Sequence, residues 1–223
     1  MTSSSENAPT LNNIQTPREE QFNAITHGVG ALLSVVGLVM LVLAAKESGE
    51  VWNLVGASVF GAALVMLYTA STIYHALPVG EIKETCRRFD HISIYFLIAG
   101  TYTVVALAAL REHPSGWGLL GGQWSMAAAG IAVKSIYGPD RFNFVSTLGY
   151  VLMGWMVVLV FGELTAALTE GALTLLIAGG VCYTLGVPFF LLDQSRKFFH
   201  SIWHVFVMAG SACHFVMAWR YLF

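Results

Sequence analysis

Charged side chains are scarce in this sequence: Asp, Glu, Lys and Arg make up 11% of its 223 residues, whereas hydrophobic residues make up 56%. A soluble domain of this length carries about twice that charged fraction. The mean hydropathy of +0.67 agrees. Too few polar side chains are present to cover a surface that faces water. A soluble all-α domain is therefore excluded, and a polytopic membrane protein is indicated.

Other features are missing as well. The formal net charge is −2 without a run of basic residues, so nucleic-acid binding is not expected. The three cysteines are widely spaced and form no CxxC, which indicates neither a disulfide framework nor a zinc ribbon. Met1 to Phe22 is polar and acidic, so we expect no cleavable signal peptide and expect the first apolar segment to direct insertion.

No GxGxxG or Walker pattern occurs either. Pairs of small residues, such as Gly56–Gly61 and Gly149–Gly154, are closer to the packing signals of membrane helices than to a phosphate loop.

Seven apolar stretches are present, each of roughly 17 to 27 residues, which suits a hydrocarbon core about 30 Å thick. They cover residues 28–45, 51–77, 89–110, 116–134, 143–162, 171–192 and 198–223. The fourth is the weakest, because its centre is rich in Gly and Ala. Continuous apolar runs favour helices over the alternating strands of a barrel. We therefore predict an all-α, seven-transmembrane helix bundle.

The predicted membrane domain covers residues 19–223. The segment before it, residues 1–18, is rich in Ser, Asn, Thr and Pro, and we interpret it as a disordered cytoplasmic tail. Residues 19–27 are expected to form a short amphipathic lead-in to the first span.

The distribution of Lys and Arg predicts the orientation. If the stretches cross in alternation, eight of the 11 basic residues fall at one end and three at the other. The larger group is Arg18, Lys83, Arg87, Arg88, Lys134, Arg141, Arg196 and Lys197, and the smaller is Lys46, Arg111 and Arg220. Because basic residues are enriched in cytoplasmic loops, we expect a cytoplasmic N-terminus and an external C-terminus.

Polar residues interrupt the apolar stretches in two places far apart in the sequence. His200 and His204 are four residues apart in the last stretch, so on a helix they share one face. Ser71 and His75 have the same spacing near the end of the second stretch, and Asp90 begins the third. In the predicted orientation all five reach the same depth, in the cytoplasmic half. We therefore predict that they form one site.

Ionisable groups inside membrane spans are costly and usually functional. A divalent metal that takes the imidazole lone pairs would accommodate His75, His200 and His204, and zinc suits imidazole. Asp90 would coordinate the metal or hydrogen-bond a water on it, and Ser71 would orient that water or stabilise a developing oxyanion. Since zinc lowers the pKa of bound water to about 7, this set suits hydrolysis of a lipid amide or ester.

Each member of the set also has a simpler interpretation. His200 could be an interfacial histidine, and Ser71 could be a helix-packing hydroxyl. Asp90 could form only an interfacial ion pair with Arg87 or Arg88. The shared depth of the five residues favours the metal site over these alternatives.

The remaining histidines are interpreted differently. His27, with Glu20 and Asn23 at the mouth of the first stretch, could support a metal ligand or cap the entry of the helix, and the structural role is favoured. His91 points about 100° away from Asp90 on a helix. His214 follows His204 by ten residues and is expected to lie too far toward the outer side for the same metal.

Four motifs carry a family resemblance: ExxNxxTH at Glu20–His27, SxxxH at Ser71–His75, FDHISIYFLIAGTYT at Phe89–Thr103 and HSIWH at His200–His204. In order and spacing the sequence resembles the hemolysin III family, the bacterial branch of the progestin and adipoQ receptor (PAQR) group. The resemblance extends over nearly the whole chain from about residue 19.

The resemblance implies seven helices and a zinc site on the cytoplasmic side. In the receptor relatives three histidines hold the zinc, and an Asp and a Ser lie close by. By motif these roles fall on His75, His200, His204, Asp90 and Ser71. Alkaline ceramidases in the wider superfamily imply lipid amide hydrolysis, and bacterial members imply the inner membrane and a link to membrane-lipid homeostasis. Without a long soluble N-terminal domain, receptor-type signalling is not implied.

Three functions stay open at this stage. The first is a zinc-dependent hydrolase of lipid amide or ester bonds, with a lipid-derived substrate. The second is a non-enzymatic sensor of the membrane in which zinc is structural. The third is a haemolysin-type protein that perturbs membranes, for which no polar stripe wide enough for a channel is present. Membrane lipids are the expected partners, and a homo-oligomer is open.

Overall fold

The structure is almost entirely helical. A computed structural model describes residues 15–223, and within them it contains helices, short turns and no strand. The elements are α1 (Pro17–Glu47), α2 (Val51–Ala76), α3 (Glu81–Ala109), α4 (Pro114–Tyr137), α5 (Asn143–Trp155), the 3₁₀ turn η1 (Met156–Val160), α6 (Phe161–Ala167), α7 (Glu170–Leu191), α8 (Phe199–Met217) and the π-helical η2 (Ala218–Leu222).

Six helical segments are long and apolar enough to cross a membrane. They are Pro17–Glu47, Val51–Ala76, Glu81–Ala109, Asn143–Ala167, Glu170–Leu191 and Phe199–Leu222. The exception among the predicted spans is α4, whose glycines and alanines lower its hydropathy. Two polar side chains on α4 are fully buried: Gln123 donates to Met153 O at 2.7 Å, and Lys134 donates to Pro139 O at 2.6 Å. The predicted all-helical fold is confirmed, and within residues 15–223 six of the seven predicted spans lie in helices long and apolar enough to cross a membrane.

Two helices begin earlier than the apolar stretches predict. The first starts at Pro17, so residues 17 and 18 of the predicted tail and all of the lead-in belong to α1, while residues 1–14 lie outside the described part. Thr16 and Glu19 form a reciprocal capping box that begins this helix. The third starts at Glu81, eight residues before the predicted span. Hydropathy marks the lipid-embedded part of a helix, and charged residues extend it into the interface.

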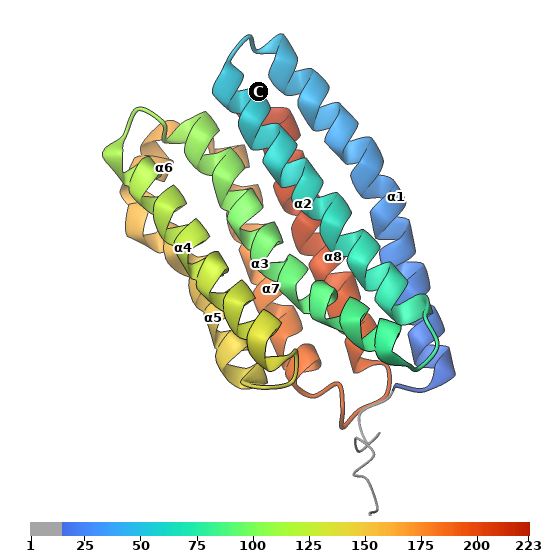
Figure 1. The fold of residues 1–223 in the computed structure, drawn as a ribbon. Coiled ribbons are helices and arrows are strands. Elements are labelled where there is room, and N and C mark those ends of the chain that lie inside the picture. The colour runs from blue at the N-terminus through green and yellow to red at the C-terminus, as the bar shows by residue number, and fades with distance from the viewer. Residues whose placement is uncertain (1–14) are drawn as a thin grey trace, which may run out of the picture.

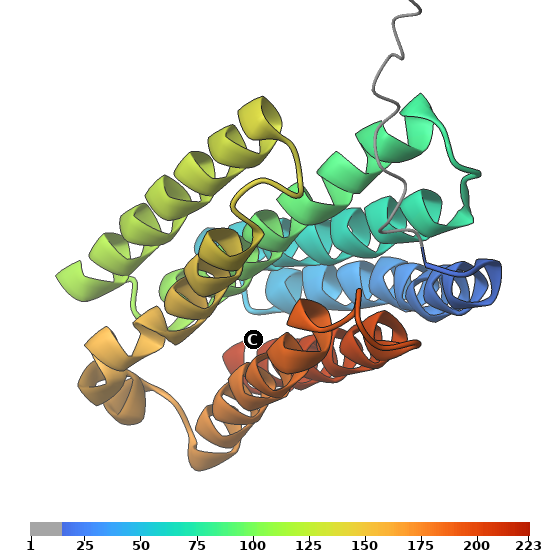
Figure 2. The ribbon, with the colours of Figure 1, turned by 90° about the horizontal axis from the view of Figure 1, so that it is seen from below.

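The helices form a closed bundle in which consecutive helices are neighbours. The ring closes because α8 packs on both α7 and α1 (Figures 1 and 2). Of the six spans α3 is the most buried, with 72% of its apolar window covered, compared with 28% for α1. Large exposed side chains on α1, such as Leu32 and Val36, supply a face for lipid.

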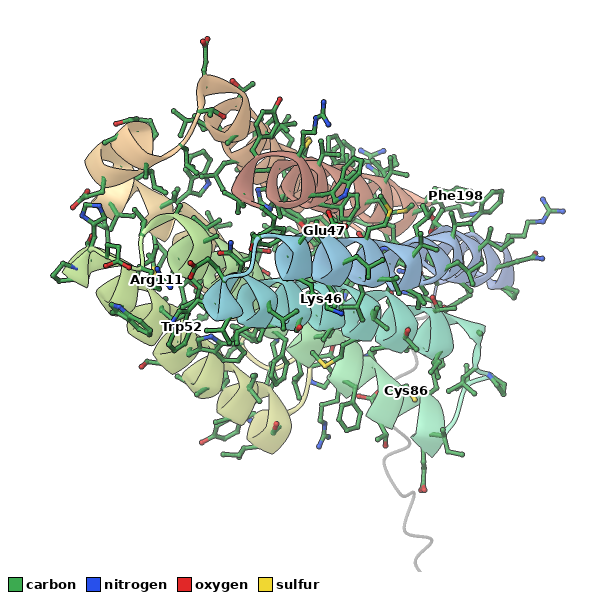
Figure 3. All side chains as sticks on the ribbon, turned by 90° about the horizontal axis from the view of Figure 1, so that it is seen from above. Lys46, Glu47, Trp52, Cys86, Arg111 and Phe198 are labelled. Atoms are coloured by element: carbon green, nitrogen blue, oxygen red, sulfur yellow. The ribbon has the colours of Figure 1, made fainter. Side chains whose placement is uncertain are left out.

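The two ends of the bundle carry different numbers of basic residues. In Figure 1 α1 starts at the lower end, where α2, α4 and α7 finish, and α8 runs from there toward the upper end. At the upper end Arg111 pairs with Glu50 at 3.2 Å, and Trp52 meets Trp117 edge to face at 5.5 Å (Figure 3). The larger predicted group of basic residues lies at the lower end, near the histidines of α2 and α8.

Candidate metal centre

Three histidines from two helices meet near the lower end of the bundle. His75 comes from the last turn of α2, and His200 and His204 come from the first turns of α8. One ring nitrogen from each lies within 4.8 Å of the other two. All three rings are nearly buried, with 1 to 9% of each residue exposed. The structure therefore brings together the three predicted metal ligands.

Two of these rings are held by carboxylates. Nδ1 of His75 is 2.7 Å from Oε2 of Glu20 on α1, and Nδ1 of His200 is 2.7 Å from Oδ2 of Asp193 in the α7–α8 loop. A carboxylate accepts hydrogen bonds and donates none, so each Nδ1 carries the proton. The other nitrogen, Nε2, is then a lone-pair donor.

The third ring has a hydroxyl partner. Nδ1 of His204 is 3.2 Å from Oγ1 of Thr26 on α1. The Thr26 hydroxyl also lies 2.9 Å from Phe22 O and 3.0 Å from Asn23 O, so its single proton goes to the backbone. Its oxygen therefore accepts from Nδ1 of His204. All three rings are thus fixed in the tautomer that offers Nε2 to a metal.

The donor set fits zinc. Nε2 of His75 is buried without a hydrogen-bond partner among residues 15–223, which is costly unless something else binds it. Tetrahedral nitrogen ligands on one zinc ion lie about 3.4 Å apart. The three ring nitrogens lie within 4.8 Å of one another, so the rings would move inward to reach this separation around an ion. Three neutral imidazoles are a ligand set that zinc sites use.

The first turns of α1 position the start of α8. The carboxylate of Glu19 accepts the backbone N–H of Phe198 at 2.6 Å, and Asn23 accepts the Ser201 hydroxyl at 2.6 Å. Phe198 has φ of 61°, a left-handed conformation that is rare for a bulky residue. The Glu19 bond holds this strained residue where α8 begins, two residues before His200.

A lysine extends the network on the other side. Nζ of Lys83 lies 3.1 Å from Oε1 of Glu20. It also donates to Tyr74 O at 2.8 Å and to Leu77 O at 3.1 Å, two carbonyls at the C-terminal end of α2. Lys83 therefore caps α2 just after His75 and neutralises the carboxylate that orients that ring.

Ser71 and Asp90 lie beside the histidines without belonging to the three-nitrogen group. Both line an internal cavity of about 110 Å³, together with His200 and His204. The Ser71 hydroxyl is buried and has no hydrogen-bond partner within the described residues. Residues of α3, α5 and α7 complete the lining of this cavity, which is mainly apolar.

The other histidines lie close to the site without belonging to the three-nitrogen group. The ring of His27 stacks on that of His204, with centroids 3.4 Å apart and planes 10° apart, so it is part of the site. His91 and His214 also line the cavity. His214 donates from Nε2 to Leu176 O at 3.1 Å and is absent from the three-nitrogen group, in agreement with its predicted distance.

Sequence reasoning missed two partners of the metal ligands. Thr26 could have been found, because it follows Asn23 by three residues and shares its helix face, and it belongs to the ExxNxxTH motif. Asp193 gives no signal of its own, since a single acid in a short loop is ordinary. Only the fold places it against His200.

Of the glycine pairs predicted to mediate packing, one does so. A Cβ on Gly56 would lie 3.0 Å from the backbone of Val104, and one on Gly61 would lie 2.5 Å from Leu38. Cβ atoms at Gly149 and Gly154 would meet nothing within 4 Å, so the packing prediction is wrong there. Spacing alone does not reveal which face of a helix has a neighbour.

Comparison with known proteins gives a consistent result. The family model for haemolysin-III-related proteins matches residues 15–215. Hemolysin-3 of Bacillus cereus is 41% identical over 201 residues, covering 90% of both chains, and the Hemolysin-3 homolog of Bacillus subtilis is 40% identical over 200 residues, covering 90% of this chain and 92% of that one. The human monocyte to macrophage differentiation factor is 30% identical over 214 residues, covering 92% of this chain and 85% of that one.

No solved structure gives a significant match. The match to the family model nevertheless covers every element from α1 to the body of α8 and includes all three histidines of the site. The chain is a multi-pass membrane protein that belongs to the haemolysin-III family.

Proposed function

We propose that this protein binds a zinc ion through His75, His200 and His204 and hydrolyses amide or ester bonds of membrane lipids, in a role tied to membrane-lipid homeostasis. The observation that carries the proposal is the arrangement of three rings, each fixed through Nδ1, around one point beside a cavity that is lined mainly by apolar side chains. When bound, zinc supplies a Lewis acid and activates water at neutral pH.

The residues around the site have distinct tasks in this proposal. Asp90 takes the proton of the attacking water, because its carboxylate lines the same cavity as the histidines. The Ser71 hydroxyl, which has no partner within the described residues, donates to the oxyanion that develops on the substrate carbonyl. The apolar side chains of the cavity hold the acyl chain and exclude water.

The proposal also includes a complete topology. In this proposal α4 also crosses the membrane and brings the number of spans to seven, since it packs between α3 and α5 within the bundle. The N-terminus is cytoplasmic and the C-terminus is external, in the bacterial inner membrane, because the larger group of basic residues lies at the end where α1 begins. The metal site is then in the cytoplasmic half.

The experiment that tests the enzyme is ceramide turnover by the purified protein, comparing wild type with Asp90→Ala. We expect wild type to release fatty acid and Asp90→Ala to lose at least 100-fold in rate while keeping its zinc. If zinc stays bound and wild type releases no fatty acid from ceramide or any ester lipid supplied, the hydrolase is refuted.

Zinc itself is tested by elemental analysis of the double variant His200→Ala/His204→Ala. We expect wild type to contain one zinc per chain and the variant to contain none. His113→Ala is the matched control, because that histidine lies in an exposed position before α4. Unchanged zinc content in the double variant would refute the proposed zinc site.

One alternative has a specific observation in its favour. The rings are tied to α1 and to the α7–α8 loop by bonds that would also suit a purely structural ion joining helices. In that case the protein is a non-enzymatic sensor of the membrane. Loss of zinc would then lower the free energy of unfolding, while no lipid would be hydrolysed by the zinc-loaded protein.

A second alternative comes from the names of the Bacillus relatives, which describe haemolysis. The cavity is lined mainly by apolar side chains, which does not suit a water-filled channel. We therefore propose that any haemolysis reflects membrane perturbation. Discrete single-channel conductance of the purified protein in planar bilayers would contradict this.

A further inference from the structure

Two of the three cysteines lie on neighbouring helices that pack against each other. Cys182 is in the middle of α7 and Cys213 is in the second half of α8, whereas Cys86 is near the start of α3. All three are free thiols that are partly exposed. The sequence indicates no disulfide framework, and only the fold shows which cysteines can meet.

The packing of α7 on α8 gives the register of this pair. The ring of Phe189 on α7 stacks on that of Phe206 on α8, with centroids 5.5 Å apart. Cys182 precedes Phe189 by seven residues, and Cys213 follows Phe206 by seven. Because the two helices run in opposite directions, these steps of about two turns lead to the same level and the same edge of the contact. The thiols of Cys182 and Cys213 therefore face each other, and the two side chains are close enough to interact.

Glycines make the contact between α7 and α8 narrow. A Cβ on Gly186 would lie 2.6 Å from the Trp203 ring, and a Cβ on Gly210 would lie 2.9 Å from the Tyr183 ring. A disulfide needs Cα atoms about 4.4 to 6.8 Å apart, which is less than the usual 8 to 10 Å between the axes of packed helices. Small residues let helices approach more closely than that. The two thiols can therefore be joined at this contact.

The cysteine pair lies at the edge of the contact that faces the acyl chains. Val181 and Leu185 on α7 and Val216 on α8 are exposed beside it, within segments apolar enough to cross a membrane. A cysteine that served only as a small apolar side chain would be packed in the core and inert. The partly exposed pair is instead within reach of a reactant that enters or crosses the bilayer.

We propose that Cys182 and Cys213 form a dithiol site that hydroperoxides oxidise to an intramolecular disulfide. One thiol sulfur takes the terminal oxygen of the hydroperoxide, whose O–O bond breaks. A sulfenic acid forms, and an alcohol, or water from hydrogen peroxide, leaves with the thiol proton. The second sulfur then attacks the sulfenic sulfur, so that the S–S bond forms, the S–O bond breaks and water leaves with the second thiol proton.

Overall, the two thiols lose two electrons and two protons, and one hydroperoxide is reduced. The disulfide ties α7 to α8, the helices on either side of the loop that carries Asp193. The inference goes beyond the proposed function, since it uses neither the three histidines nor the cavity beside them.

The test exposes the purified full-length protein in phospholipid vesicles to one of two hydroperoxides. Hydrogen peroxide reaches the thiols from water, and linoleic acid hydroperoxide reaches them from the bilayer. Remaining thiols are alkylated, and peptide mapping by mass spectrometry locates a disulfide by the loss of two hydrogen atoms. Cys86 is the internal control, because it lies on α3, away from the α7–α8 contact.

We expect a disulfide between Cys182 and Cys213 of one chain, formed roughly tenfold faster than any oxidation of Cys86, because the second thiol is already in place. A neutral dithiol should restore both thiols. Cys86→Ala should behave like wild type, and Cys182→Ala should leave Cys213 without an intramolecular disulfide. The same disulfide from either reagent supports the site, and the faster reagent identifies whether the oxidant comes from the bilayer or from water.

Three results with wild type would overturn the inference. Both thiols could persist while Cys86 is oxidised, each could be oxidised separately to a sulfinic acid, or the cysteines could be linked only between chains. Since these results are read on the unmodified sequence, they do not depend on the folding of a variant.

Discussion

Nδ1 of His75 lies 2.7 Å from Oε2 of Glu20, although 55 residues separate the two in the chain. The carboxylate orients a ring on α2 from the first turn of α1, and it bonds at the same time to Lys83 on α3. One side chain thus joins three helices at the point where a metal ligand is presented. Replacing the Glu20 carboxylate tests whether the orientation of the His75 ring affects zinc binding.

Glu20→Gln should weaken zinc binding by about 10- to 100-fold, because loss of the carboxylate lowers the basicity of His75 and loosens its orientation. Competition with a chelator of known affinity measures the zinc dissociation constant in detergent. Glu84→Gln is the matched control, since Glu84 is exposed and pairs only with Arg87. Equal affinities for wild type and Glu20→Gln would show that the carboxylate does not support the ligand.

Thr26→Val should weaken zinc binding less, by roughly threefold, because a neutral acceptor contributes about half as much as a charged one. Valine keeps the shape of threonine and removes only the oxygen that accepts from His204. The same chelator competition applies, with Thr165→Val, an exposed threonine on α6, as control. A loss as large as that of Glu20→Gln would mean that ring position, rather than charge, governs the affinity.

Lys83→Met should lower the free energy of unfolding by about 3 kcal/mol, since it leaves Glu20 without its cation and two carbonyls of α2 without a donor. Methionine retains the length of the side chain, so packing is largely kept. The free energy of unfolding is measured in mixed micelles that contain increasing amounts of a denaturing detergent. Lys46→Met, at an exposed position at the end of α1, should change stability by less than about 0.5 kcal/mol. Similar losses in both variants would contradict a capping role.

Gly56→Ala should destabilise the bundle by about 1 to 3 kcal/mol, because its Cβ would lie 3.0 Å from the Val104 backbone and force α2 away from α3. Gly149→Ala should stabilise it by about 0.5 to 1 kcal/mol, because the added methyl meets no atom and alanine favours the helix. Thermal unfolding in detergent compares the two. A change of the same sign in both variants would contradict the packing described for α2 and α3.

The sequence predicts the all-helical membrane fold and the meeting of the three histidines well. His75, His200 and His204 are recognisable because imidazoles at helical spacing are out of place in apolar runs. The predicted helix starts are less accurate. The charged segment from Glu81 to Arg88 forms the first turns of α3, although it precedes the apolar stretch. Hydropathy reports the surroundings of a residue and does not report its backbone hydrogen bonds.

The partners of the ligands are harder to predict for a different reason. Glu20, Thr26 and Asp193 each become significant only through a contact with a histidine, and the contacts of Glu20 and Thr26 span 55 and 178 residues of the chain. His27 is interpreted as structural from sequence, because its stacking partner lies on the last helix. The contacts of Thr26 and His27 with His204 depend on the closure of α8 against α1, which no local pattern encodes.

That closure also sets the order in which the site is assembled during synthesis. The ribosome makes Glu20 and Thr26 first, whereas His204 emerges 178 residues after Thr26. Glu20 can pair with His75 and Lys83 once α2 and α3 are in place, whereas the Thr26 hydroxyl lacks its histidine partner until α8 has entered the membrane. The three nitrogens of His75, His200 and His204 come together only at this last step, so the proposed metal site exists only in chains whose final helix has been inserted against α1 and α2.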